Sequence, residues 1–235
     1  MMDHFKKKVW SRPWPLLGLA CILILSLIIC ASNHRAQAQD ERGPADIVRV
    51  YYDKVLQALD QDKVNQEKLR LRLQELAGQV FNYDIMARMS LGKEWRNLNS
   101  DQQQRFVRLF TELLERTYFR KIQKHLDTAT SYTDEDMQVT DEIIFSARKA
   151  EVKSEIAYED TKVPVDYRFV KLDGAWKIYD VLVEKVSLVQ NYRTQFTDIL
   201  RDHSSEQFMQ TLQDRVAEQR IQEHNATAAQ PTEDS

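Results

Sequence analysis

The chain has 235 residues, of which 43% are hydrophobic and 29% are charged, and its formal net charge is −3 at pH 7. This length allows one domain of ordinary size, with a core large enough to enclose a cavity. The acidic balance argues against nucleic acid as a partner, because nucleic-acid binding depends on clustered basic residues that neutralise phosphates.

The first 38 residues have the pattern of a secretory signal peptide. Basic residues between positions 6 and 12 precede an apolar run over residues 16–29, and Ala36-Gln37-Ala38 supplies the small residues that a signal peptidase reads. An uncleaved membrane anchor is the alternative, but the run is shorter than the roughly 20 residues that a spanning helix needs. We therefore expect cleavage near Ala38-Gln39 and export of the remaining chain.

The predicted exported chain contains no cysteine, because Cys21 and Cys30 both lie in the leader. It holds 28 basic and 35 acidic residues, a formal charge of −7. An exported domain without disulfides depends on its hydrophobic core for stability. We expect one folded domain over residues 39–222 and a disordered polar tail over residues 223–235.

The exported chain begins with a helical part. Helix starts are indicated at four places: Pro44, Asn65, Asn82 or Asp84, and Ser100. The longest helix is predicted from Ser100, at the start of a capping-box sequence, to about Leu126. Its apolar residues cover an unusually wide arc, which favours contact with two layers at once.

From about residue 137 the apolar residues alternate with a period of two, which predicts β-strands. The clearest pair is a hairpin in which Asp173-Gly174 turns the chain between a strand beginning at Val163 and a strand over residues 175–184. Helical spacing returns behind Ser187, a predicted N-cap. Four antiparallel strands with helices before and after them predict an α+β fold, in which a curved sheet is covered by helices on one face.

The sequence carries no recognisable catalytic or metal-binding motif. The three histidines beyond the leader are far apart, no cysteine is available, and four dispersed glycines cannot form a phosphate-binding loop. We therefore expect no metal, no cofactor and no catalytic residue. The alternative is a small enzyme that uses Tyr83 with Asp84, or Tyr179 with Asp180, as acid or base in a cavity.

Two blocks of the sequence resemble the same protein family. The first, over residues 80–118, reads VFNYDIMARMSLGKEWRNLNSDQQQRFVRLFTELLERTY; the second, over residues 163–196, contains PVDYR, G-x-W-K-I-Y-D-V and V-E-x-V-S-L-V-x-N-Y-R-x-Q-F. Both resemble the MlaC (toluene-tolerance) family of periplasmic phospholipid-binding proteins, including its hopanoid-associated relatives. Lys185 stands where we expect the family's Gly, so the turn between the last strand and the next helix is expected to differ.

The resemblance implies a cavity of NTF2-like or cystatin-like form between the sheet and the helices. This cavity would take the acyl tails of a phospholipid as cargo and leave the headgroup near solvent. Ten residues of the matching blocks are expected to line it: Phe81, Met86, Leu113, Tyr118, Tyr167, Phe169, Tyr179, Val181, Val189 and Tyr192. Without the resemblance, the same pattern is more typical of an ordinary hydrophobic core.

The resemblance also implies a location and partners. A periplasmic carrier of this kind would shuttle phospholipid between an outer-membrane lipoprotein and porin complex and an inner-membrane ABC transporter with an MCE-domain protein. It would thereby maintain the lipid asymmetry of the outer membrane. A hopanoid or another lipid is the alternative cargo, because acyl and polycyclic pockets are built from the same apolar side chains.

Four arginines fall close to one face of the longest predicted helix: Arg105, Arg108, Arg116 and Arg120. They could meet a lipid phosphate or an acidic docking surface. Glu112 and Glu115 interleave with them, however, and this favours a solvated helix face whose charges pair with each other.

Overall fold

A computed structural model of the chain describes residues 42–62, 65–126, 136–158 and 161–228. These residues form six α-helices, one 3-10 helix and a five-stranded antiparallel sheet, which confirms the predicted α+β class. The predicted leader lies outside the described residues, so its cleavage stays a prediction. Within the described ranges, none of the helices has the length and hydrophobicity to cross a membrane.

The helices are α2 (Pro44–Asp62), α3 (Gln66–Val80), α4 (Tyr83–Leu91), the 3-10 helix η2 (Gly92–Asn97), α5 (Ser100–Leu126), α6 (Leu188–Asp202) and α7 (Ser205–Ala228). Two predicted N-caps are confirmed at the starts of α3 and α4. The Asn65 side chain accepts a hydrogen bond from the Lys68 amide at 2.9 Å, and the Asn82 side chain accepts one from the Ile85 amide at 2.8 Å. Each cap satisfies an amide that the first helical turn would leave unpaired.

The longest helix, α5, is capped one residue earlier than predicted. The Asn99 side chain accepts a hydrogen bond from the Gln102 amide at 2.9 Å, and the Gln102 side chain accepts one from the Asn99 amide at 3.0 Å. This reciprocal pair is the capping box, because an asparagine oxygen caps a helix as well as a serine hydroxyl does. The prediction that Ser100 opens the box was therefore wrong by one position.

The strands are β1 (Met137–Ser146), β2 (Lys149–Tyr158), β3 (Thr161–Leu172), β4 (Ala175–Val183) and β5 (Val186–Ser187), and they lie in this order across the sheet. The sequence predicts four strands, and the structure adds the fifth. This short strand pairs with Leu182 and Val183 of β4. It forms because the chain reverses immediately after β4, at Glu184 and Lys185, before α6 begins.

Two tight turns join the last three strands. Asp173 and Gly174 have φ angles of 48° and 85°, which confirms the predicted hairpin between β3 and β4. The second turn has positive φ angles at Glu184 (49°) and Lys185 (66°). Neither residue is glycine, so both adopt a backbone conformation that L-amino acids disfavour.

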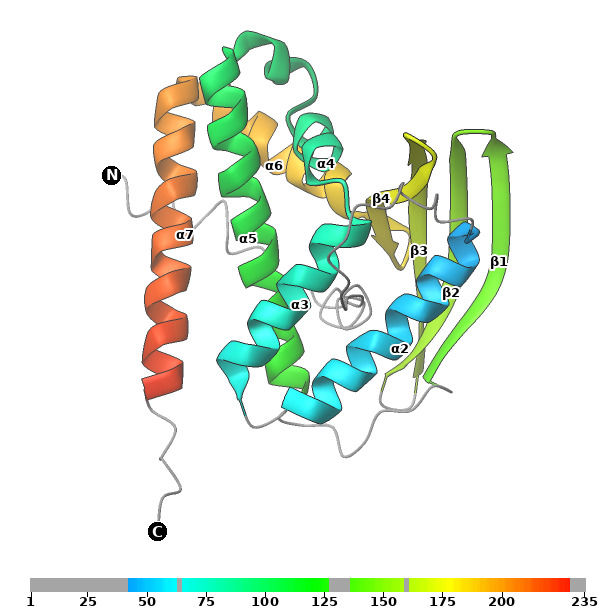
Figure 1. The fold of residues 1–235 in the computed structure, drawn as a ribbon. Helices are drawn as coiled ribbons and strands as arrows, with labels where there is room; N and C mark the ends of the chain where they lie inside the picture. Colours follow the sequence, from blue (N-terminus) through cyan, green and yellow to red (C-terminus); the bar gives the residue numbers. More distant parts are fainter. Residues whose placement is uncertain (1–41, 63–64, 127–135, 159–160, 229–235) are drawn as a thin grey trace, which may run out of the picture.

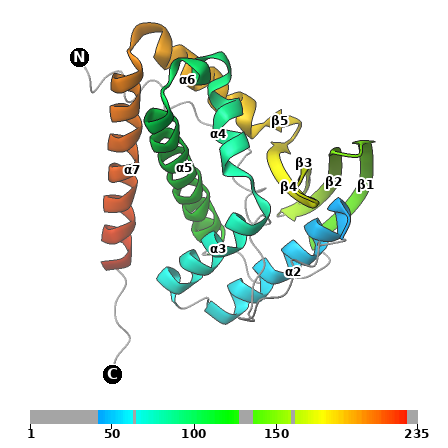
Figure 2. The ribbon, with the colours of Figure 1, turned by 45° about the horizontal axis from the view of Figure 1, so that its top comes forward.

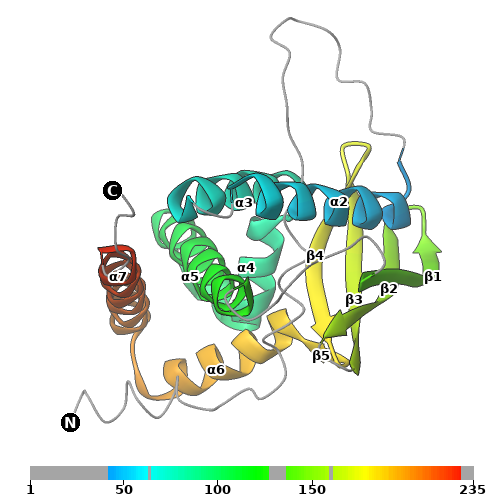
Figure 3. The ribbon, with the colours of Figure 1, turned by 90° about the horizontal axis from the view of Figure 1, so that it is seen from below.

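The sheet occupies one side of the molecule, and most of the helices occupy the other (Figures 1 and 2). Helix α2 lies along the sheet, and α3 extends from it toward α5 (Figure 3). Helices α4 and α6 pack against each other, and α6 also packs on β4. Helix α7 packs on α5 and lies farthest from the sheet (Figure 1).

An aromatic cluster joins α5, α6 and α7. Its members are Phe106, Phe110, Tyr192, Phe196 and Phe208, whose neighbouring ring centroids lie between 5.2 and 6.0 Å apart. Four of these rings are fully buried phenylalanines. Rings at these separations add to the stability that burial of their apolar area provides.

Strand β1 forms the open edge of the sheet. Its pairing with β2 shifts register between Val139 and Asp141, and again between Ile144 and Ser146. Each shift interrupts the regular ladder of backbone hydrogen bonds. Ile144 and Phe145 of this strand are 54% and 60% exposed.

The last helix, α7, continues to Ala228 and therefore extends past residue 222, where the sequence predicts a tail to begin. Its start is a capping box: the Ser204 amide donates to the Gln207 side chain at 2.9 Å, and the Gln207 amide donates to the Ser204 hydroxyl at 3.3 Å. Near its other end Glu223 forms an ion pair with α5. Residues 229–235 lie outside the described residues.

Candidate functional site

An apolar pocket lies between α3, α4, α5 and the sheet. Its enclosed volume is about 60 Å³, which is less than the roughly 300–1,000 Å³ typical of small-molecule sites. Nine of its lining residues offer mainly hydrocarbon or aromatic surface: Leu73, Ala77, Phe81, Met86, Leu114, Tyr118, Phe119, Val181 and Leu188. Such a lining favours an apolar ligand, because binding removes hydrocarbon surface from water on both partners.

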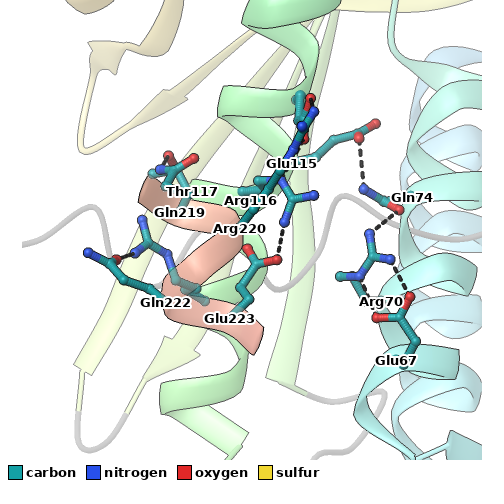
Figure 4. A network of polar contacts seen from close by, with 12 residues as sticks. Glu67, Arg70, Gln74, Glu115, Arg116, Thr117, Gln219, Arg220, Gln222 and Glu223 are labelled. Atoms are coloured by element: carbon teal, nitrogen blue, oxygen red, sulfur yellow. Dashed lines mark hydrogen bonds and ion pairs between the residues drawn. The ribbon is translucent and has the colours of Figure 1, made fainter. Parts of the chain in front are cut away.

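The other four lining residues, Arg70, Gln74, Tyr83 and Glu115, form a polar strip. Arg70 Nη1 donates to Gln74 Oε1 at 2.8 Å, and Gln74 Nε2 donates to Glu115 Oε2 at 2.9 Å (Figure 4). The Tyr83 phenol also hydrogen-bonds to Glu115. The Gln74–Glu115 bond is a direct link between α3 and α5, which form two walls of the pocket.

The polar strip contains a carboxyl group whose charge changes near neutral pH. Burial raises the pKa of Glu115 to about 7, although hydrogen bonds from Tyr83 and Gln74 act to lower it. Burial, together with the charge of Glu115, also raises the pKa of Tyr83 well above its ordinary value. Beside them, Arg70 Nε donates to Glu67 Oε2 at 2.9 Å, and this hydrogen bond lowers the pKa of Glu67.

Four of the ten residues predicted to bind lipid line this pocket: Phe81, Met86, Tyr118 and Val181. They come from α4, α5, β4 and the connection between α3 and α4, which the fold brings together. Phe81 follows α3 and forms an isolated β-bridge with Ile178 of β4, so the end of α3 is fixed to the sheet. Its ring stacks on Tyr83 with centroids 6.0 Å apart.

Five other predicted residues are buried but are not part of this lining: Leu113, Tyr167, Phe169, Val189 and Tyr192. Tyr192 belongs to the aromatic cluster, and Tyr167 lies opposite Val181 in the neighbouring strand. An apolar pattern cannot separate a side chain that faces a cavity from one that packs against its neighbours. A role for these five in binding stays a prediction.

Tyr179, the tenth predicted residue, is half-buried outside the lining, at a register shift between β3 and β4. Burial raises the pKa of Tyr179. The nearby charge of Arg168 acts to lower this pKa, and the charge of Asp180 acts to raise it. The Asp180 carboxylate accepts hydrogen bonds from the start of α6. The other pair considered in the sequence analysis is Tyr83 with Asp84. Asp84 is exposed, and the Tyr83 phenol bonds to Glu115 instead.

Across the described ranges, no cluster of histidine, cysteine, aspartate or glutamate could hold a metal ion.

The sequence analysis did not identify three members of the polar strip, namely Arg70, Gln74 and Glu115. A signal for two of them exists in α3, where Arg70, Leu73, Gln74 and Ala77 have the spacing of one helix face. Polar side chains inside an apolar stripe need polar partners when they are buried. That requirement could have indicated a strip of this kind, although not the residue on α5 that completes it.

The sequence analysis favours a solvated face of α5 whose charges pair with each other. Of the pairs made by Arg105 and Arg116, only Arg116–Glu112 fits this prediction, because α7 covers the face and supplies the other partners. Arg105 Nη1 lies 2.7 Å from Glu206 Oε1 of α7. Arg116 lies 2.8 Å from Glu112 on its own helix and also pairs with Glu223 of α7 (Figure 4). These arginines hold α7 against α5, on another side of the helix from Glu115.

Comparisons with known proteins give a family and a fold. A family model described as MlaC protein matches residues 49–214. Among solved structures, the phospholipid-binding protein from Ralstonia solanacearum, determined in complex with a phospholipid, is similar with a TM-score of 0.63. The two are 23% identical, and the match covers 78% of this chain and 99% of that chain. A search of the curated proteins found no match.

Proposed function

This chain belongs to the MlaC family, and we propose that it is a phospholipid carrier and not an enzyme. The observation that carries the proposal is the apolar pocket between the sheet and α3, α4 and α5, which has four polar residues among its thirteen lining residues. A phospholipid has the same division, with hydrocarbon tails at one end and a charged headgroup at the other. The protein from Ralstonia solanacearum, which shares the fold, contains a bound phospholipid, and this supports the same class of cargo here.

In this proposal the acyl tails contact Phe81, Met86, Tyr118 and Val181 in a cavity of the NTF2-like or cystatin-like kind. Exposing hydrocarbon to water costs about 0.8 kcal/mol per methylene, so two tails with roughly 28 methylenes lose more than about 20 kcal/mol in the aqueous phase. A pocket lined with hydrocarbon returns most of this loss once its walls have moved apart to admit the tails, because its enclosed volume without lipid is only about 60 Å³. Because membrane and pocket then have similar free energies for the lipid, no covalent chemistry is needed for transfer.

The place of action that fits this family is the periplasm, reached through the predicted signal peptide. There the protein would shuttle phospholipid between an outer-membrane lipoprotein and porin complex and an inner-membrane ABC transporter with an MCE-domain protein, and so maintain outer-membrane lipid asymmetry. The direction of transfer would be set by these complexes, since the pocket itself holds the lipid at nearly the free energy of a membrane.

Native mass spectrometry of the protein purified from periplasm without detergent tests the binding step. We expect one phospholipid bound to each chain, and lipid extraction would identify it. A protein without lipid, which also takes up none from labelled vesicles, would contradict the proposal.

A pair of matched substitutions connects the lipid to the pocket. Val181 lines the pocket and is 1% exposed, whereas Val186 is 43% exposed. Val181→Arg should abolish lipid retention, because the longer side chain fills the space of the tails and puts a charge into the apolar lining. Val186→Arg should retain the lipid. Circular dichroism must show that both variants are folded, and lipid retained by a folded Val181→Arg variant would place the cargo elsewhere.

A further inference from the structure

The apolar pocket is too small for its proposed cargo in the form that the structure shows. Its enclosed volume of about 60 Å³ lies far below the roughly 300–1,000 Å³ of small-molecule sites, and a phospholipid has two long tails. One wall must therefore move before the tails can enter. The walls differ in how firmly the rest of the fold holds them, and this difference identifies the wall that moves.

Helix α5 and the sheet form the fixed part of the pocket. The Phe106 and Phe110 rings of α5 belong to the aromatic cluster that joins this helix to α6 and α7, and Arg116 pairs with Glu223 of α7. Helix α4 packs on α5 and α6, and both α4 and α6 pack on β4. Close-packed elements of this kind resist displacement, because few voids separate them. Helix α3 is the remaining helical wall.

The C-terminal end of α3 is fixed to the sheet. Phe81 forms the isolated β-bridge with Ile178 of β4, and the Asn82 amide donates to the Ile178 carbonyl at 2.8 Å. The Lys177 ammonium of the same strand donates to the Gln79 carbonyl. This end of α3 therefore stays in place when another part of the helix moves.

Gly78 lies immediately before this anchored end. Beyond the adjoining backbone, a Cβ at this position would meet no atom within 4 Å, so packing does not require a glycine here. A glycine inside a helix weakens the helix relative to alanine. Ahead of Gly78, Lys68 and Arg72 of α3 pair with Asp62 at the end of α2. The forward part of α3 can therefore tilt together with that end of α2.

A hydrogen bond holds the forward part of α3 against α5. Gln74 Nε2 donates to Glu115 Oε2 at 2.9 Å (Figure 4). Both residues keep a second partner when this bond breaks, because Gln74 Oε1 accepts from Arg70 of its own helix and Glu115 is bonded to Tyr83 of α4. The bond can therefore open without leaving either side chain alone.

We propose that α3 is a gate of the apolar pocket, which pivots at Gly78 and is held shut by the Gln74–Glu115 hydrogen bond. Entry of the tails breaks this bond and moves α3 away from α5, and release of the lipid lets the bond form again. The free energy needed to open the gate then sets the rate of lipid uptake. This inference rests on the proposed function, since it concerns the pocket that takes the same cargo.

The initial rate of lipid uptake tests the hydrogen bond. Delipidated protein is mixed with vesicles of phosphatidylethanolamine and phosphatidylglycerol that contain a phospholipid with pyrene-labelled tails, and the loss of excimer emission reports transfer of this lipid to the protein. Gln74→Leu should raise the initial rate about tenfold, the factor for one hydrogen bond to a charged group. Gln219→Leu is the matched control. Gln219 Nε2 also donates at 2.9 Å, to Thr117 Oγ1, but this bond joins α7 to α5, so the rate should stay at the wild-type value.

A second pair of variants tests the pivot. Gly78→Ala makes α3 stiffer and should lower the initial rate about fivefold, the factor by which alanine favours a regular helix over glycine. Gly43→Ala removes a glycine outside α3 and should leave the rate unchanged. An alanine Cβ has room at both positions, so both variants should fold, and circular dichroism checks this.

The outcomes separate the gate from the carrier function. A wild type that takes up lipid, with a folded Gln74→Leu variant that is no faster or a Gly78→Ala variant that is no slower, would overturn the inference and leave the carrier proposal standing. Equal acceleration by Gln219→Leu would do the same. If Gln74→Leu does not fold, the Gly78→Ala rate decides alone. A wild type that takes up no lipid would overturn both proposals.

Discussion

The ammonium of Lys185 lies 2.8 Å from Oδ2 of Asp166, a residue that is only 3% exposed. Lys185 also has a φ of 66° in the turn between β4 and β5. One residue therefore bears a backbone cost and supplies the charge that a buried carboxylate needs. A glycine would remove that cost and would also remove the charge.

Replacing Lys185 with glycine should make the protein less stable, by about 1 kcal/mol. The gain from relieving a left-handed residue is about 1 kcal/mol, and the loss of a partly exposed partner for a buried acid is about 2 kcal/mol. Urea denaturation at pH 7 measures the net effect. The double variant Lys185→Gly, Asp166→Asn should be more stable than Lys185→Gly alone, and the opposite order would show that the pair matters less than the backbone.

Filling the pocket should block lipid uptake without unfolding the protein. Ala77 lines the pocket on α3, while Leu71 on the same helix is 53% exposed. Ala77→Phe places a ring where the acyl tails would lie, and we expect at least a tenfold loss of lipid bound from vesicles. Leu71→Phe is the matched control and should bind as the wild type does. Equal uptake by both variants would exclude this wall of the pocket as part of the lipid site.

Glu115 should make stability fall as the pH rises. Its pKa is about 7 in the folded protein, against an ordinary value of 4.5, so between these values the folded state binds more protons than the unfolded state. The free energy of unfolding should then decrease by about 3 kcal/mol between pH 4.5 and pH 7.5. In urea denaturation the Glu115→Gln variant should lose this decrease, and an unchanged pH dependence would argue against a buried titrating carboxyl.

Glu112→Gln is a control for this pH series, because the pKa of Glu112 is shifted in the opposite direction from the pKa of Glu115. Although burial acts to raise it, hydrogen bonds from Arg220 and Arg116 hold the pKa of Glu112 below its ordinary value. The stability from this group is therefore present above pH 4.5 and is lost as the pH falls. Glu112→Gln should destabilise the protein at pH 7 and have less effect at pH 4.

Removing the Phe208 ring should loosen the attachment of α7. This side chain is fully buried and contacts Phe106 and Phe196, with ring centroids 5.9 and 5.2 Å away. Phe208→Ala should cost about 3 kcal/mol, because it leaves a cavity among close-packed rings. Hydrogen exchange should show faster exchange of α7 amides than in the wild type. Ile221→Ala, at a position 61% exposed, should change the free energy of unfolding by less than about 0.5 kcal/mol.

Local patterns predicted most of the fold. The Asp173-Gly174 turn and the caps at Asn65, Asn82 and Ser187 depend on neighbours within a few residues, and the structure confirms each of them. The wrong prediction at the start of α5 also concerned neighbouring residues. Asn99 and Ser100 are both good caps, so the sequence could not decide between two positions one residue apart.

The candidate site was less accessible from the sequence, because its parts come from elements that are distant along the chain. Val181 and Tyr118 are apolar residues like many others, and only the packing of α3 and α4 against β4, and of α4 against α5, places them at one cavity. The position of Tyr179 depends on a register shift beside Arg168, which period-two alternation does not predict. The Glu115 partner of Gln74 lies 41 residues away, beyond any local pattern.

The irregular edge strand has a consequence for solubility. A long, regular edge offers a row of unpaired backbone groups on which another chain can add a strand, and exposed apolar residues such as Ile144 and Phe145 would strengthen that contact. The two register shifts in β1 divide this edge into short stretches, and between them Glu142 accepts a hydrogen bond from the Ala45 amide of α2. An edge interrupted in this way is a poor template for a strand of a second copy.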